Sequence, residues 1–353
     1  MIKWVPAAVI ALLAALALMG GHLRAYEVAH GPRCTYALAE QARPAADVVL
    51  IGASRVRRGL DPDYIEALLA EAGQDIHVDR LSLNLPNFPQ YFPLLKRYVE
   101  TRGAPRIAYL QLAYNFKPER QASWDLPVNT QRNLAFARMS ELAQVQRGTP
   151  LNDQGTTLPR QLQAGFQSLP AAWLTRVEMR VFSALRYMPK RLRGHQPDCS
   201  ETLMRNNGTD VAISGTTLAA GEAMGFVPPD PAKLAAWQAE AADFLPLAPD
   251  APWRQGETAQ LRKLITLLED AGTKVVFLIM PSITQRHVDA DTLARLAAVF
   301  PGIEVHFPMG DYDGPLAEQI SVSFVDTHHV NDFGAVYLSR ALARDLAQRL
   351  EAQ

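Results

Sequence analysis

Two short segments of this chain carry the residue types of a nucleophilic hydrolase. Near the start of the chain, an apolar run leads directly into Ser54. Near the end, the motif D-x-x-H-x-N-x-x-G begins at Asp326 and places His329 three residues later. A serine hydroxyl is a weak nucleophile until an imidazole accepts its proton, and the imidazole needs an acidic partner that holds its tautomer. The ordered set of serine, acid and histidine therefore predicts acyl transfer through a serine.

Each of these residues also has a structural interpretation. Serine is common in tight turns after strands, so Ser54 by itself is a weak indication of catalysis. The distal acid and histidine, in the expected chain order, make the catalytic interpretation the stronger one. His328 directly precedes His329, and we interpret it as a neighbour without a role in proton transfer. The other histidines show no partner spacing and are interpreted as surface or interior residues.

The segments around these residues predict an α/β fold with a doubly wound, mostly parallel sheet. Apolar runs typical of buried strands lie at 48–51, 107–113, 275–280 and 303–307. Helical patterns alternate with them at 93–101, 257–271, 291–300 and 334–350. Strands that alternate with helices are typical of a parallel sheet covered on both faces, and a site is expected at the carboxyl ends of its strands.

The helix expected after Ser54 has clear boundaries in the sequence. Asp61 can accept a hydrogen bond from the first free N–H groups, and Pro62 suits the first helical turn. Gly73 follows the last apolar residue of the pattern and ends the helix.

The N-terminus predicts a membrane helix or an export signal. After Lys3 the chain is apolar and carries no charge until Arg24. No well-placed small-residue cleavage site follows, which favours an uncleaved anchor over a cleaved signal. Lys3 and the free amine favour an N-terminus on the inside and an exported body. We therefore expect an anchor or signal over 1–21, a connector over 22–45 and a catalytic domain over 46–353.

A large, mostly helical insertion is expected at about 125–250, where the alternation of strands and helices breaks down. It ends in a proline-rich stretch at 246–252 and is expected to wall the active-site face. Cys199 lies within it, and Cys34 follows the membrane segment. In an oxidising compartment the two thiols can pair, which would contribute about 5 kcal/mol on the chain-entropy model, or they can remain unrelated.

Composition excludes few function classes. The chain has 353 residues, 48% of them hydrophobic and 20% charged, which is ordinary for a globular protein. A net charge of −1 gives no electrostatic reason to expect a nucleic-acid partner. No cysteine or histidine spacing predicts a metal site, and no cofactor is expected.

With these motifs in place, the chain resembles the SGNH (GDSL-like) hydrolase superfamily. More narrowly, it resembles membrane-anchored members that act on cell-envelope polymers, of the alginate O-acetyltransferase or D-alanine transfer protein type. The resemblance covers roughly residues 46–124 and 257–350. It implies a flavodoxin-like three-layer sandwich and four sequence blocks that build one site.

The four blocks match this chain residue by residue. Ser54 matches the nucleophile, and its backbone N–H contributes to the oxyanion site. Asn87 stands where the family usually has a glycine whose N–H meets the oxyanion, and asparagine tolerates the left-handed conformation better than most residues. Asn115 matches the asparagine whose side chain is the third oxyanion donor, although the usual glycine before it is absent. Asp326 and His329 match the acid and the base.

The resemblance implies an exported serine acyl esterase or O-acyltransferase. The substrate would be ester groups, chiefly acetyl, of a cell-envelope polysaccharide, and a transferase would receive its acyl groups from a multi-spanning membrane acyltransferase. The body would lie in the periplasm or outside the cell, anchored by one helix or released after signal cleavage. The alternative is a catalytically inactive SGNH-like protein for envelope assembly or glycan binding, to which the departure at Asn87 points.

Overall fold

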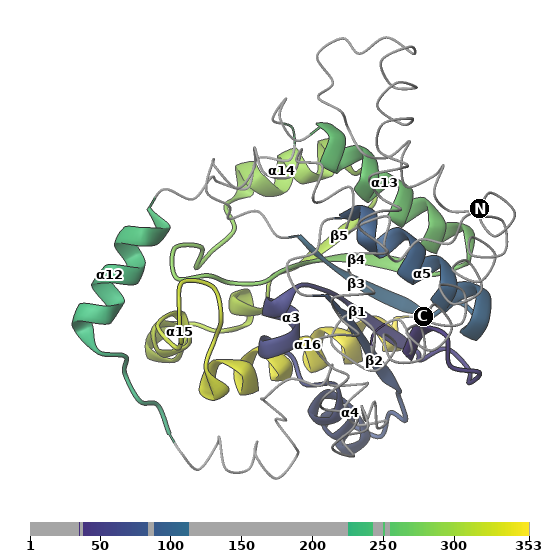
Figure 1. Cartoon of the computed structure of the whole chain (residues 1–353). Helices are drawn as coiled ribbons and strands as arrows, with labels where there is room; N and C mark the ends of the chain where they lie inside the picture. Colours follow the sequence, from purple (N-terminus) through teal and green to yellow (C-terminus); the bar gives the residue numbers. More distant parts are fainter. Residues whose placement is uncertain are drawn as a thin grey trace, which may run out of the picture.

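The protein is an α/β structure built on one parallel sheet. In the computed structural model it is described over residues 35, 38–83, 88–112, 225–242, 250 and 255–352. Five parallel strands lie in the order β2-β1-β3-β4-β5 (Figure 1). Their bounds are β1 Val48–Gly52, β2 Val78–Ser82, β3 Ile107–Leu112, β4 Lys274–Ile279 and β5 Glu304–His306. The predicted parallel sheet is therefore confirmed.

The central strands are buried on both sides, as their continuous apolar sequences predict. Every residue of β1 and β3 is buried, because helices cover both faces of the sheet. The chain leaves β1 for β2 on one side and returns to β3 on the other side. The strand order thus reverses at β1, and the crevice beside its carboxyl end is where an open α/β sheet places a ligand site.

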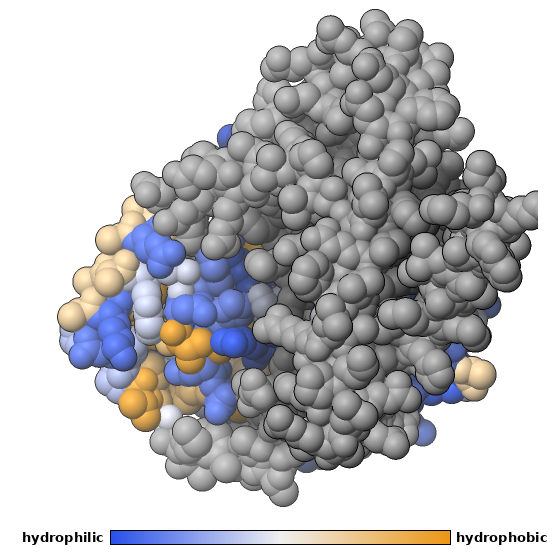
Figure 2. Space-filling view, in the orientation of Figure 1, coloured by the Kyte–Doolittle hydropathy of each residue, from blue (hydrophilic) through white to orange (hydrophobic). Residues whose placement is uncertain are grey.

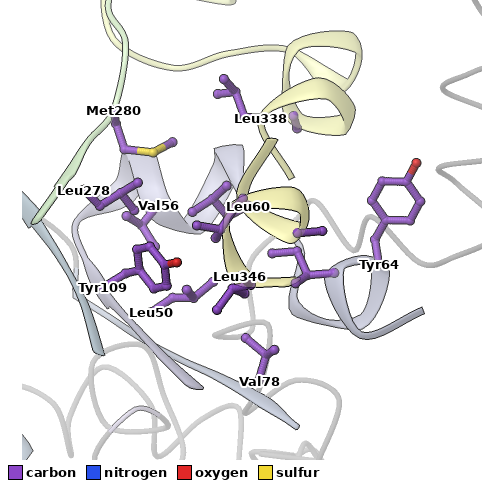
Figure 3. Packing of buried hydrophobic residues seen from close by; sticks show 14 of the residues in the cluster. Leu50, Val56, Leu60, Tyr64, Val78, Tyr109, Leu278, Met280, Leu338 and Leu346 are labelled. Atoms are coloured by element: carbon purple, nitrogen blue, oxygen red, sulfur yellow. The ribbon is translucent and has the colours of Figure 1, made fainter. Parts of the chain in front are cut away.

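Two groups of helices cover the two faces. On one face, α5 (Phe88–Arg102) and α13 (Gln255–Asp270) bury apolar side chains against the sheet. On the other face lie α3 (Ser54–Gly59), α4 (Pro62–Glu71) and α16 (Asp332–Glu351). Figure 3 shows Val56 and Leu60 of α3 directed into a core formed by strand residues and by Leu338 and Leu346 of α16. The remaining described elements are α12 (Pro231–Ala241), α14 (Ala290–Val299), η4 (Pro308–Asp311) and α15 (Gly314–Ser321).

The helices and strands expected outside the insertion are present, but the structure also contains elements that were not predicted, among them the helices α3, α12 and α15. Strand β2 was not anticipated, because its sequence contains Asp79 and Arg80, although both are buried. The buried charge of Asp79 is paired with Arg102, whose Nη1 lies 2.6 Å from Asp79 Oδ2. The same oxygen accepts a hydrogen bond from the hydroxyl of Tyr98 at 2.8 Å. Helix α5 begins several residues before Pro93, which the sequence suggested as its start.

Part of the predicted connector belongs to the domain. Leu38 and Ala39 are fully buried in the same core as α5, and the Thr35 hydroxyl donates to the carbonyl of Ser82. The packed chain thus begins before residue 46. The predicted anchor at 1–21, Cys34 and Cys199 lie outside the described residues, as does most of the insertion. In the part of the chain that is described, no helix has the length and apolarity needed to cross a bilayer.

The described surface gives no sign of a large apolar patch. On the face shown in Figure 2, the described residues are mostly hydrophilic, with small hydrophobic spots among them. Within the described ranges, the large apolar side chains that are exposed are Val227, Leu293 and Val325. Isolated exposed apolar residues of this kind are common on folded proteins.

Asp61 links two of the helices that pack beneath the site. As the sequence predicts, its carboxylate accepts from the N–H of Asp63 at 3.0 Å and caps α4. Its own N–H donates to the hydroxyl of Ser339 on α16. Burial is the main reason that the pKa of Asp61 is raised to about 6, although the charge of Arg80 opposes the shift.

This raised pKa predicts a pH-dependent stability. The folded state holds the Asp61 proton more tightly than the unfolded chain does, so the stabilisation present below the ordinary value of 3.8 is lost as pH rises through about 6. Asp61→Asn keeps the cap without the charge. We expect the variant to be more stable than wild type at pH 7 by roughly 1–3 kcal/mol, with the gap closing toward pH 4. Urea unfolding between pH 4 and 8 measures this, with Asp63→Asn as the control on the same helix. Parallel pH profiles for wild type and Asp61→Asn would contradict the prediction.

Candidate active site

Ser54 lies at the point where the first strand turns into a helix. It is the first residue of α3, directly after β1, and the preceding Ala53 is the extended N-cap residue, with φ −84° and ψ −162°. Gly52 leaves no room for a side chain: a Cβ there would lie 2.4 Å from Val56 Cγ2 and 2.5 Å from Gln111 Oε1. The glycine of the Gly-Ala-Ser motif is therefore required by close packing beneath the turn.

Gln111 holds this turn from the neighbouring strand. Its side chain shares a face of β3 with Tyr109, which packs in the core against α3 and α16. Its Oε1 accepts a hydrogen bond from the N–H of Ala53 at 2.7 Å. Its Nε2 is buried and has no hydrogen-bond partner in the described part of the chain. The role of Gln111 was not predicted, although a glutamine in an otherwise apolar strand is a visible feature of the sequence.

The far end of α3 is fixed by a buried arginine. The Nη1 group of Arg80 donates to the carbonyl of Arg57 at 2.6 Å and to the carbonyl of Leu60 at 2.7 Å. These are carbonyls that a helix leaves unpaired at its C-terminus. Since α3 spans only six residues, holding both ends fixes the direction of its first residue, Ser54.

The acid and the histidine share a tight loop before α16. Asp326 Oδ1 accepts from the N–H groups of His328 and His329, at 2.8 Å each. The N–H of Val325 donates to the carbonyl of His329 at 2.9 Å, which closes the loop. An aspartate that bonds the backbone two residues further on is a common turn-forming device. The D-x-x-H spacing thus bends the chain so that the ring returns to the carboxylate.

The remaining motif residues begin α16. The side chain of Asn331 is the N-cap and accepts from the N–H of Gly334 at 3.0 Å. A Cβ on Gly334 would lie 2.9 Å from Val330 Cβ and 3.1 Å from the carbonyl oxygen of Ser323. Asn331 and Gly334 therefore shape the turn into the final helix.

The structure brings Ser54, His329 and Asp326 together in one hydrogen-bonded chain. The Nδ1 atom of His329 lies 2.7 Å from Asp326 Oδ2 and 2.9 Å from Oδ1, and its Nε2 lies 2.7 Å from the Ser54 hydroxyl. An ionised carboxylate can only accept, so the ring proton is on Nδ1 and Nε2 accepts from the serine. The imidazole side chain is 18% exposed, and Ser54 is half-buried. This geometry suits removal of the serine proton by the ring.

Asp326 remains ionised because hydrogen bonds outweigh its burial. Burial acts to raise its pKa, but the ring of His329 and the N–H groups of His328 and His329 hold the pKa well below the ordinary carboxyl range. The charged form is therefore kept throughout the neutral and mildly acidic range. Its stabilising effect on the loop is lost only as pH falls through this lowered value.

A second contact joins α3 to the same loop. The guanidinium of Arg55, next to Ser54, donates through Nη2 to Nδ1 of His328 at 2.9 Å. Arg55 is buried, and its charge acts on Asp326 as well. Neither Arg55 nor His328 was given a role from sequence.

Two predicted oxyanion residues fall outside the described residues. Asn87 and Asn115 both belong to segments whose placement is not given, so their side chains are not part of the described site. The segment before Asn87 does reach the nucleophile turn, because the N–H of Leu83 donates to the carbonyl of Gly52 at 3.0 Å. Within the described residues, no group of histidine, cysteine or acidic side chains is arranged to hold a metal ion.

Comparison with known proteins adds no identification. No model of a known protein family matches this chain, and no curated protein matches it in sequence.

The Gln111 contact predicts a loss of serine reactivity. Gln111→Met keeps the side-chain length but removes the acceptor, which leaves the half-buried N–H of Ala53 without this hydrogen bond, at a cost of about 1 kcal/mol. Because the turn then loosens, we expect the rate at which a fluorophosphonate labels Ser54 to fall by about 10–100-fold. Gln260→Met, at another buried glutamine on α13, is the matched control. Equal labelling of Gln111→Met and wild type would show that the contact does not position the serine.

Proposed function

We propose that this protein is an SGNH-type serine acyl esterase or O-acyltransferase of the cell envelope. The observation that carries the proposal is the hydrogen-bonded chain from Asp326 through His329 to Ser54, with the serine at the carboxyl end of β1. An acid that fixes the ring and a ring nitrogen that accepts from the serine are the two requirements for a serine nucleophile. The parallel sheet, with helices on both faces, agrees with the three-layer sandwich of that superfamily.

The first half-reaction forms an acyl-enzyme. Ser54 Oγ attacks the ester carbonyl carbon while its proton passes to His329 Nε2, and Asp326 stabilises the imidazolium that results. The tetrahedral intermediate then collapses, the ester C–O bond breaks, and the ring returns the proton to the leaving alcohol. Ser54 is left esterified, and the ring is neutral again.

The developing oxyanion needs donors on the side away from the imidazole. The N–H of Ser54 is a candidate, because the first N–H groups of a helix have no partner within the helix. The N–H of Ala53 is excluded, since Gln111 already accepts from it. By resemblance, Asn115 and Asn87 supply the other donors. Loss of one such donor typically costs about 10²–10³ in rate.

The second half-reaction determines whether the protein is an esterase or a transferase. The same acyl-enzyme is attacked by water in an esterase and by a sugar hydroxyl in a transferase. We propose an envelope polysaccharide as the polymer and acetyl as the acyl group. A transferase would obtain its acyl group through a multi-spanning membrane acyltransferase. The apolar segment at 1–21 would anchor the exported body to the membrane, or would be removed after secretion.

Replacement of the nucleophile tests the enzyme proposal. Ser54→Ala should lower hydrolysis of p-nitrophenyl acetate by roughly 10⁴-fold or more, since the acyl-enzyme can no longer form. Ser321→Ala is the matched control, because that hydroxyl bonds the carbonyl of Glu318 within its own helix. Unchanged thermal unfolding of both variants shows that the fold is retained. Equal hydrolysis by wild type and Ser54→Ala would refute the assignment.

The inactive alternative predicts a different chemical result. Asn87, in place of the usual glycine, is the sequence feature that favours it. A fluorophosphonate probe should label Ser54 in an active protein, and peptide mass spectrometry locates the label. A folded wild-type protein that stays unlabelled would support a role in envelope assembly or glycan binding.

The substrate is tested in the cell. Mass spectrometry of envelope glycans from a deletion strain should show lost acetylation if the protein is a transferase and raised acetylation if it is an esterase. Wild-type protein should restore the original level, and Ser54→Ala should fail to do so. Identical glycans in the deletion and parent strains would exclude this polymer class as the substrate.

A further inference from the structure

Arg55 is a buried cation whose hydrogen-bond partner in the described part of the chain is a histidine ring rather than a carboxylate. It follows the nucleophile directly and is 8% exposed. Within the described residues, no acidic side chain forms an ion pair with it, and its hydrogen bond goes to Nδ1 of His328 at 2.9 Å. Asp326 acts on it through charge at longer range.

Burial of this charge is unfavourable for the fold. Burial lowers the pKa of Arg55 to about 10, and the charge of Asp326 only partly offsets this, so the side chain is still protonated at neutral pH. Apolar residues of similar volume often replace buried charges with little loss of stability or even a gain. Core packing therefore does not explain why an arginine lies here, next to the catalytic triad of Ser54, His329 and Asp326. A role in the site is the remaining explanation.

The contact determines the state of His328. A guanidinium can only donate, so Nδ1 of His328 must carry a lone pair and the ring is neutral with its proton on Nε2. The backbone N–H of the same residue donates to Asp326 Oδ1 at 2.8 Å. The rings of His328 and His329 are 6.5 Å apart between their centroids and nearly perpendicular. Arg55 thus holds one side of the loop, and the triad occupies the other side.

We propose that Arg55 is a positioning residue that acts through His328 to hold the acid–histidine loop against α3 and to place a positive charge beside the triad. The proposal rests on the function proposed above. The hydrogen bond keeps His329 Nε2 in reach of Ser54. The charge favours an ionised Asp326 and a neutral His329, which is the resting state that accepts the serine proton.

Several groups of the described residues act on the charge of His329. Its ring contacts Asp326 and Ser54, and Arg55 reaches it through His328. Two further charged residues of the described chain lie on neighbouring elements. Arg286 follows β4, and its segment contacts the loop because the N–H of Ile283 donates to the carbonyl of Thr327. Asp332 lies in the first turn of α16. Removal of Arg55 leaves the negative charges in place and takes away a cation on α3.

The test combines imidazole NMR titration with Ser54 labelling by fluorophosphonate. In Arg55→Met, the ring of His329 should titrate at a higher pH than in wild type, because a positive charge beside the loop of Asp326 and His329 is removed. At a pH where the ring is neutral in both proteins, labelling should be about 10-fold slower, because the loop is less well held. Arg97→Met is the control. It removes another buried arginine, which pairs with Glu40 on the opposite face of the sheet, and it should leave the titration unchanged.

Variants of His328 separate the contact from the ring itself. His328→Phe removes the acceptor and should slow labelling as Arg55→Met does, and the double variant should be no slower than Arg55→Met, because both act on one contact. His328→Asn offers an acceptor oxygen near the position of Nδ1 and should restore labelling. Fully additive losses, loss of labelling in His328→Asn, or an unchanged His329 titration in Arg55→Met would each overturn the proposal.

Failure of the proposed function gives a distinct result. If wild-type Ser54 is not labelled, the enzyme assignment fails and the NMR titration decides the Arg55 proposal alone. A shifted His329 titration in Arg55→Met then supports the placement of the charge, and an unshifted one overturns it.

Discussion

The hydrogen bond between His329 Nε2 and Ser54 Oγ joins two turns that are 275 residues apart in the chain. A hydrogen bond of 2.7 Å requires both atoms to be placed accurately, so the conformation of each turn must be well defined. The parallel sheet supplies the common frame. Ser54 leaves the carboxyl end of β1, and the loop of His329 is held by the first turn of α16, a helix that packs on the same face as α3.

Both turns are stabilised by close packing at a glycine and by hydrogen bonds to backbone groups, in addition to apolar burial. Gly52 allows Val56 and Gln111 to pack closely beneath the turn that carries Ser54. Gly334 allows the first turn of α16 to pack closely against Val330. Asp326 serves two purposes, since the same carboxylate bends its loop and orients the ring. A substitution at either glycine would therefore disturb the site without touching a reacting atom.

Buried charge is the unusual feature of the packing around the site. Arg80, on the edge strand β2, is buried and bonds the last carbonyls of α3, while Arg55 is buried at the start of the same short helix. Buried cations are unfavourable unless they are well bonded. The helix that carries the nucleophile is thus held at both ends by arginines, since Arg55 bonds the ring of His328 and Arg80 bonds backbone carbonyls.

The sequence by itself determined the α/β class, most of the helices and strands and the cap at Asp61, and the family resemblance of its closing motif selected His329 rather than His328 as the partner of Ser54. These features depend on local periodicity, on turn chemistry and on a three-residue spacing that a single loop can satisfy. The tertiary structure alone decided the roles of Gln111, Arg55 and Arg80, because each contacts a segment distant in sequence. A glutamine in an apolar strand marks Gln111 as unusual, but nothing in the local sequence names the N–H that it bonds. Strand β2 was missed for the same reason: Asp79 looks like a surface residue until the fold supplies Arg102 and Tyr98 as partners.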